Sequence, residues 1–182
     1  GDIDIDGTLT VSASGQTIDL SGGGSNDISG AITLTGSVVS YADTTATSIA
    51  GITATGALNL TSGGEVTQSG AIDADSTASV TAGANAITLT NAGNDFTGAV
   101  SLSNSGAFDV ALTDANALDL GTVVVGQDLA VTTGGALTDS GAVTVVGLGT
   151  IVSTGFDVTL GDSTTANFGS LDFSGATVSI TE

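Results

Sequence analysis

Residues 56–70 read GALNLTSGGEVTQSG, and residues 126–141 read GQDLAVTTGGALTDSG. Aligning their Gly-Gly pairs and their Ser-Gly pairs gives the same offset of 71 positions each time (134 − 63 and 141 − 70). Outside this stretch, Val80 precedes Ile151 by 71 positions and follows Val11 by 69. Self-similarity at a fixed period is the signature of a repeat protein. The sequence therefore predicts a super-repeat of about 70 residues.

Further series of equivalent residues, such as Tyr41, Val110 and Val178, divide each super-repeat into three smaller units. Each unit holds three short strand-like runs separated by Gly, Ser, Asn or Asp, which is the pattern of a parallel β-helix coil. We expect an all-β fold, a right-handed parallel β-helix with three strands per coil and three coils per super-repeat. Seven full coils with a partial coil at each end account for the chain.

Alternation of apolar and polar residues supports the strands. In the opening GDIDIDG, Ile3 and Ile5 point to one side and the aspartates to the other, as in a half-buried strand. No window keeps helical spacing, and Gly, Ser, Thr and Val are poor helix formers. The chain contains no Pro, so every backbone N–H can join a ladder between coils.

Charge and composition exclude several functions. The chain has 19 acidic residues and no Lys, Arg or His, for a formal charge of −19, so it offers no basic surface for nucleic acid or anionic lipid. No apolar run approaches the ~18 residues of a membrane span, so we expect no membrane insertion. Zero Cys excludes disulfides. A mean hydropathy of +0.44 argues against disorder.

The whole chain, residues 1–182, is predicted to be a single continuous solenoid segment, because each coil of such a fold contacts only its neighbours. The pattern is unfinished at Gly1 and at Glu182, which favours a piece of a longer repeat array. The partners expected at the two ends are further copies of the repeat, either covalently continuous or stacked end to end.

Three stretches carry a resemblance to a known family: GALNLTSGGEVTQSG (56–70), ANAITLTNAGNDFTGAVSLSNSG (84–106) and ALTDANALDLGTVVVG (111–126). They resemble the repeats of filamentous-haemagglutinin-like bacterial surface adhesins, which are exported by two-partner secretion. The resemblance covers essentially the whole chain. It implies a right-handed β-helix, an extracellular or cell-surface location, and a role as a stalk or fibre that meets a host or environmental glycan or surface.

No catalytic residue is predicted. Polysaccharide lyases of this fold resemble one another in using an Arg or Lys base, which this chain lacks. Glycan hydrolases need only two carboxylates at a suitable separation, so a glycan-active enzyme is kept as a further alternative. The candidate carboxylates lie at ordinary solvent-facing strand positions: Asp2, Asp4, Asp73, Asp75, Asp109 and Asp119.

Calcium is the cofactor that the sequence leaves possible, because hard oxygen atoms are the only type of metal ligand that its side chains offer. Asn26-Asp27 and Asn94-Asp95 each resemble one unit of the calcium-binding repeat of RTX proteins, and a calcium-dependent binding module is the alternative function. The competing interpretation is that these residues close turns by bonding their own backbone and tolerating positive φ. The same loops carry Ile28, Phe96 and Phe168, which we expect to fold back over the coil as caps.

Overall fold

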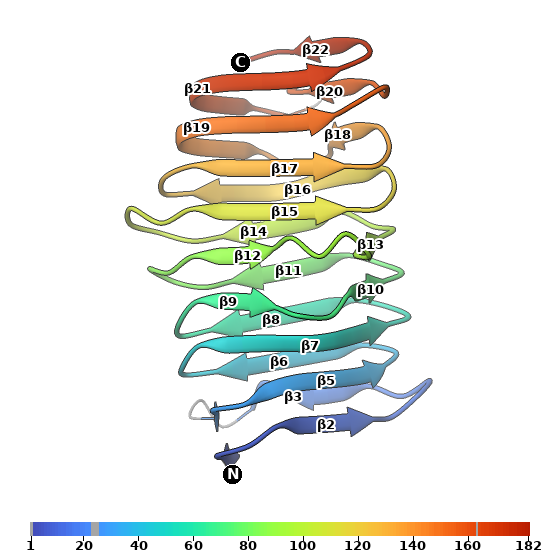
Figure 1. Cartoon of the computed structure of the whole chain (residues 1–182), viewed down its shortest axis with the longest axis vertical. Coiled ribbons are helices and arrows are strands. Elements are labelled where there is room, and N and C mark those ends of the chain that lie inside the picture. The colour runs from blue at the N-terminus through green and yellow to red at the C-terminus, as the bar shows by residue number, and fades with distance from the viewer. Residues whose placement is uncertain (1, 23–25, 163) are drawn as a thin grey trace.

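The computed structural model describes residues 2–22, 26–162 and 164–182. These residues form a parallel β-solenoid of about nine coils of about 20 residues each. In Figure 1 the chain runs to the right in front and to the left behind as it rises from the N-terminus, which is a right-handed coil. The described residues contain no helix, and therefore none that is long and apolar enough to cross a membrane. The predicted fold class is confirmed.

Parallel pairing between successive coils makes three faces, which we call faces I, II and III. At the N-terminal end of face II, β1 and β4 pair only with each other and form a separate two-stranded sheet. Some strands turn a corner and contribute to two faces. Face I contains β3 (Ile18–Leu20), β6 (Val39–Asp43), β8 (Leu58–Ser62), β11 (Ala78–Thr81), β14 (Val100–Ser103), the second part of β16 (Leu118–Val125), and the first parts of β19 (Val143–Ser153) and β21 (Ala166–Gly175).

Face II contains β1 (Asp4–Ile5), β4 (Asp27–Ile28), the first part of β7 (Thr47–Ala54), β9 (Val66–Gln68), β12 (Ile87–Leu89), β15 (Val110–Asp114), β17 (Leu129–Thr133), and the second parts of β19 and β21. Face III contains β2 (Leu9–Ser12), β5 (Ala31–Gly36), the second part of β7, β10 (Ile72–Ala74), β13 (Asp95–Phe96), the first part of β16, β18 (Leu137–Asp139), β20 (Val158–Leu160) and β22 (Val178–Ile180).

Ladder neighbours lie one coil apart in the sequence. The offset ranges from 17 residues between Ala31 and Ser48 to 23 residues between Leu9 and Ile32. Three short strands with tight corners fit within that length. The three-strand coil predicted from the sequence is confirmed.

The segments around Ile28, Phe96 and Phe168 differ from the prediction. All three side chains are buried, as expected, but they belong to strands rather than to loops that cap the coil: Ile28 and Phe96 lie in the two-residue strands β4 and β13, and Phe168 lies in the first part of β21. Ile28 pairs with Ile5, Phe96 with Ala74, and Phe168 with Val145. The sequence analysis therefore missed three sides, which together make one further coil, and the predicted seven full coils with a partial coil at each end become about nine coils. Part of the first predicted loop, residues 23–25, lies outside the described residues.

This extra side changes how the super-repeats are related. Val11 lies in β2 on face III, its equivalent Val80 in β11 on face I, and Ile151 in β19 on face II. A super-repeat is therefore three coils plus one further face, instead of three coils. Successive super-repeats are turned by a third of a turn about the solenoid axis.

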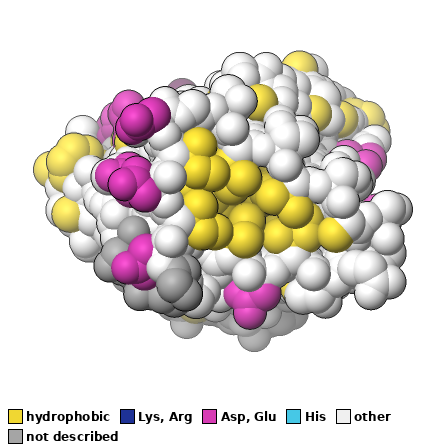
Figure 2. Space-filling model, turned by 90° about the horizontal axis from the view of Figure 1, so that it is seen from below, with side chains coloured by type: hydrophobic (Ala, Val, Ile, Leu, Met, Phe, Trp, Pro, Cys, Tyr) yellow, Lys and Arg dark blue, Asp and Glu magenta, His cyan; other side chains and the backbone are white. Residues whose placement is uncertain are grey.

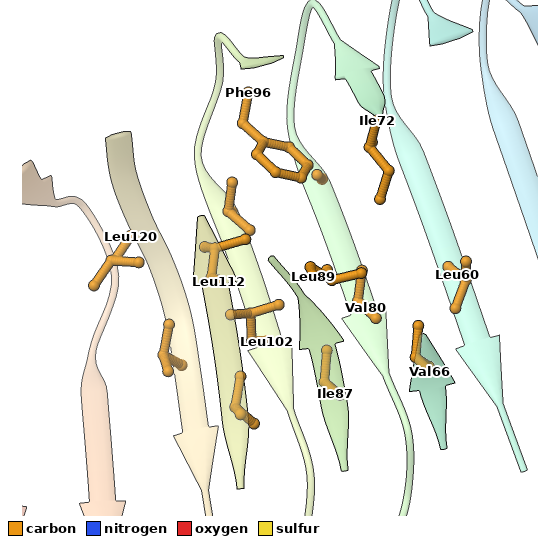
Figure 3. Packing of buried hydrophobic residues seen from close by; sticks show 14 of the residues in the cluster. Leu60, Val66, Ile72, Val80, Ile87, Leu89, Phe96, Leu102, Leu112 and Leu120 are labelled. Atoms are coloured by element: carbon orange, nitrogen blue, oxygen red, sulfur yellow. The ribbon is translucent and has the colours of Figure 1, made fainter. Parts of the chain in front are cut away.

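Inward side chains from the three faces make one continuous core of Val, Leu, Ile, Ala, Phe and Tyr. In Figure 3, Leu60, Val80 and Leu102 follow one another on neighbouring strands, so like residues stack on like. The corners are tight. A Cβ atom at Gly63 or at Gly134 would overlap the backbone of the coil below, so these Gly-Gly turns allow the coils to approach at the normal ladder spacing.

Candidate functional site

Polar side chains enter the solenoid at its corners, and two of the predicted calcium residues are among them. Asn26 is buried and bonds three successive coils: its Oδ1 accepts from the Ile3 N–H (3.0 Å), and its Nδ2 donates to the carbonyls of Leu20 (2.7 Å) and Ala42 (3.0 Å). Its amide therefore satisfies backbone groups that the corner removes from the ladders.

Asn94 repeats this arrangement 68 positions later (94 − 26). Its Oδ1 accepts from the Ile72 N–H (2.9 Å), and its Nδ2 donates to the carbonyls of Leu89 (3.1 Å) and Thr113 (3.0 Å). Gln68 forms a paired amide contact with it: Gln68 Nε2 donates to Asn94 Oδ1 (2.8 Å), and Asn94 Nδ2 donates to Gln68 Oε1 (2.9 Å).

The turn interpretation of these asparagines needs a correction. Among the described residues every positive φ belongs to Gly, so neither Asn26 nor Asn94 adopts the left-handed conformation. Both hold adjacent coils together, whereas the sequence suggested that they close their own turns.

Asn104 is a third buried amide of the same kind, which sequence reasoning missed. Its Nδ2 donates to the carbonyls of Asn85 (3.0 Å) and Phe108 (2.9 Å), and its Oδ1 accepts from the Gly126 N–H (3.1 Å). The signal was present, because Asn104 continues the inward alternation of Val100 and Leu102.

Buried carboxylates occupy other corners. Asp43 is 5% exposed; its Oδ2 accepts from the Tyr41 hydroxyl (2.6 Å) and the Ile28 N–H (3.2 Å), and its Oδ1 from the N–H of Thr45 (2.8 Å). Burial, followed by the hydrogen bond to Asp43, raises the pKa of Tyr41 far above its usual range.

Asp114 is the equivalent of Asp43 in the next super-repeat (114 − 43 = 71). Its Oδ1 accepts from the Phe96 N–H (2.9 Å) and its Oδ2 from the Asn116 N–H (3.3 Å). Burial raises the pKa of Asp114, although the backbone hydrogen bonds act in the opposite direction. The carboxylates of Asp43 and Asp114 therefore fix the two-residue strands β4 and β13 to the coil above.

The aspartates of the two predicted calcium motifs lie on different faces, Asp27 on face II and Asp95 on face III. Asp27 Oδ1 accepts from the Thr45 hydroxyl (3.1 Å). Asp95 is the ladder neighbour of Asp73, and burial, together with the charges of Asp75 and Asp95, raises the pKa of Asp73.

The candidate carboxylates Asp2, Asp4, Asp73, Asp75 and Asp109 are exposed, and Asp119 is half-buried. Within the described ranges, no three His, Cys, Asp or Glu side chains group closely enough to hold a metal ion. A shallow pocket of about 200 Å³ is lined by Asn26, Ala42, Asp43, Thr44 and Thr61. The amide of Asn26 and the carboxylate of Asp43 already bond backbone there, so the polar corners of this solenoid serve the stacking of its coils.

The geometry thus defines a β-solenoid repeat protein. Two stretches, residues 36–103 and 107–178, match a family model described as repeats of unknown function (DUF5649). Together they cover more than three quarters of the chain, and they start 71 positions apart (107 − 36), as the internal repeat requires. The chain belongs to this family. No curated protein and no solved structure matches it.

Proposed function

We propose that the chain is a structural segment, a stalk or fibre, of an acidic extracellular bacterial adhesin or surface filament of the filamentous-haemagglutinin type. One observation carries this proposal: coils of about 20 residues stack one on another over one continuous core, so the solenoid is uniform along its described length. Among the described residues, the partly buried hydrophobics packed against the core all lie in the first or last coil: Ile3, Ile5, Leu9, Val11, Ala13, Leu20, Leu171, Val178 and Ile180.

Comparison of equivalent positions shows that place in the stack causes this exposure. Val11 is only partly buried, whereas its equivalent Val80 is fully buried in the middle of the solenoid. Phe173 is 49% exposed, whereas Leu102, 71 positions earlier (173 − 102), is fully buried. Figure 2 shows the N-terminal end, where an apolar centre is ringed by polar and acidic side chains.

Several properties of the chain suit a fibre. Each added coil extends the backbone ladders and the core in one direction, so length increases without a new fold. The charge of −19 opposes lateral association of neighbouring fibres and is best tolerated in a salty medium.

Antibody labelling of intact cells that express the full-length protein tests the proposed surface location, and labelling only after cell lysis would contradict it.

Extension of the array tests the structural role. Val178 and Val110 are equivalent (178 − 110 = 68), so a copy of residues 115–182 placed after Glu182 continues the repeat in phase. We expect backbone amides of β21 and β22 to become strongly protected from hydrogen exchange in the extended chain, because they become interior. An extension with the same residues in scrambled order is the matched control. Equal protection in both chains would contradict a segment built to be continued.

A calcium-dependent binding module is the second candidate, favoured by the stacked carboxylates of Asp73 and Asp95. A divalent cation would relieve their repulsion. Thermal unfolding with calcium, magnesium or sodium at matched ionic strength tests it, with Asp95→Asn as the variant. A stabilisation by calcium that Asp95→Asn abolishes supports the module. An equal response to magnesium indicates general screening of the negative charge.

A glycan-active enzyme is the remaining alternative. It would use the exposed carboxylates, and release of reducing ends from neutral and acidic polysaccharides is the direct test.

A further inference from the structure

Face I, which lies at the back of Figure 1, differs from the other two faces in its charge. The outward side chains of β6, β8, β11 and β14 are Ser, Thr, Ala and Asn throughout. Among the described residues, the strands of face I carry one outward acidic side chain, Asp19. One outward position stacks on the next over seven successive coils without a charge, and we call these residues the central column: Ala42, Thr61, Thr81, Ser103, Val124, Thr144 and Asn167.

Many acidic residues of the solenoid belong to the other two faces. They point outward on face III or face II, or directly precede a strand of face II: Asp73, Asp95 and Asp119 (face III), Asp27 and Asp172 (face II), and Glu65, Asp109 and Asp128 (before β9, β15 and β17). Two copies of this chain therefore bring the fewest carboxylates together when they meet through face I.

Exposed apolar side chains gather on the same side of the molecule. Val124, in the central column, is 44% exposed, and Val146, which directly follows the face I part of β19, is 69% exposed. Phe108 and Leu148 are exposed where the chain passes from face I to face II, on the coils below and above Val124. Apolar side chains that gather on an exposed surface mark an interaction site.

The charge of the chain argues for the kind of partner that covers this face. A positively charged partner would be drawn to the acidic faces II and III rather than to face I. A second copy of the chain is repelled by those two faces, and face I is the side on which its own carboxylates are fewest. At ~0.15 M salt charges are screened over ~8 Å, so the carboxylates on the far sides of two paired solenoids interact weakly.

The position of the exposed apolar side chains favours one orientation. Val124 and Val146 lie in the upper half of face I, whereas Ser40 and Asn59 lie in its lower half. Two copies with parallel axes, related by a two-fold axis along the solenoid, set each coil beside the same coil of the partner, so the apolar halves meet. Antiparallel axes would set the apolar half of one copy against the polar half of the other.

We propose that face I is a lateral docking surface for a second copy of this chain, with the two solenoid axes parallel and the central columns facing each other. The proposal goes beyond the structural role proposed above, because a stalk can work singly. Seven coils at ~4.8 Å spacing give a contact of about 30 Å by 10 Å on each copy. Such a contact buries about 600 Å² in total, below the ~1,000 Å² of a stable interface, so single segments pair weakly and added coils strengthen the pairing.

Introduced cysteines test the pairing, because the chain has no Cys of its own. Thr61→Cys and Thr144→Cys each place a thiol in the central column, one in each half. Thr88→Cys, at the outward position of β12 on face II, is the matched control.

At ~0.15 M NaCl, with copper-catalysed oxidation by dissolved oxygen, we expect Thr61→Cys and Thr144→Cys each to form disulfide-linked dimers at least about tenfold faster than Thr88→Cys, because paired copies raise the local thiol concentration. Equal rates in all three chains would overturn the proposal. Dimers that form only when Thr61→Cys and Thr144→Cys are mixed would overturn the parallel orientation.

Added charge gives a second test in the Thr61→Cys chain. Ser79→Asp with Ser101→Asp adds two carboxylates on adjacent coils of face I. Thr88→Asp with Ala111→Asp adds two on adjacent coils of face II and is the matched control. We expect the face I pair to slow dimer formation by about tenfold and the face II pair by less than about twofold. Equal slowing by both pairs would show a response to net charge alone and would overturn the proposal.

These outcomes are separate from the test of the structural role. Protection of β21 and β22 in the chain extended by residues 115–182 does not require a second copy, so failure of the lateral pairing leaves that result unchanged.

Discussion

Replacing Asn94 by Ala is expected to be among the most destabilising single substitutions in this chain. The side chain satisfies the Ile72 N–H and the carbonyls of Leu89 and Thr113, and it also pairs with the amide of Gln68. A buried backbone group left without a partner costs about 1–3 kcal/mol. Three such groups give an expected loss of about 3–6 kcal/mol, allowing for partial entry of water.

Asn91→Ala is the matched control. Asn91 lies three residues earlier in the same segment, is half-buried, and accepts from the Gly93 N–H (2.9 Å) at the surface. Its loss should cost less than about 1 kcal/mol, because water replaces a surface hydrogen bond.

Urea unfolding followed by circular dichroism measures both variants, and hydrogen exchange of the Ile72 amide locates the effect. Equal losses of unfolding free energy for Asn94→Ala and Asn91→Ala would refute the argument that the Asn94 amide joins three coils.

Repeating the urea titration with and without calcium separates a structural role of Asn94 from a role as a calcium ligand. A structural amide gives the same loss in both, whereas a calcium ligand gives a larger loss when calcium is present.

Three further substitutions or conditions test other parts of the fold. Leu102→Ala should lower the free energy of unfolding by about 2–5 kcal/mol in urea titrations, because the side chain is fully buried, and a loss below about 0.5 kcal/mol would mean that the inward face is misassigned. Gly134→Ala should destabilise by about 1–3 kcal/mol, because the new Cβ would overlap the coil below, while Gly7→Ala, with open space around it, should be close to neutral in the same assay. The folded-state pKa values of Asp73 and Asp114 are raised, so the folded state binds protons more readily and stability should increase as pH falls from 7 toward the ordinary carboxylate range. Asp73→Asn should make that dependence, measured by thermal unfolding, shallower, and an unchanged slope would contradict the assignment.

Much of the fold could be predicted because the core follows alternation. Strands such as Leu58–Ser62 and Val110–Asp114 place an apolar residue inward at every second position, and the pattern repeats about every 70 residues. The position of Ile28 could not be assigned in this way. A strand of two residues has one inward side chain, so it shows no alternation and looks like an apolar residue within a loop.

The polar corners were missed for a related reason. Asp43 follows Val39 and Tyr41 at the next inward position, and Asn104 follows Val100 and Leu102 in the same way. A polar residue at the end of an apolar pattern is normally taken as the start of a solvent-exposed turn. Here the side chain is buried at the corner, and its polar group bonds backbone groups that have no partner in the ladders. Gln68 gave no signal by itself, because its partner Asn94 belongs to the next coil.

The rotation of each super-repeat by a third of a turn constrains how this family can change length. Equivalent residues of successive super-repeats lie on different faces, as Val11, Val80 and Ile151 do, so all three faces must accept the same kinds of inward side chain. Duplication or deletion of a unit then need not preserve whole turns. A gain or loss of one, two or three sides leaves a continuous backbone spiral, and the array tolerates copy-number changes that would place mismatched layers against each other in a solenoid with three dissimilar sides.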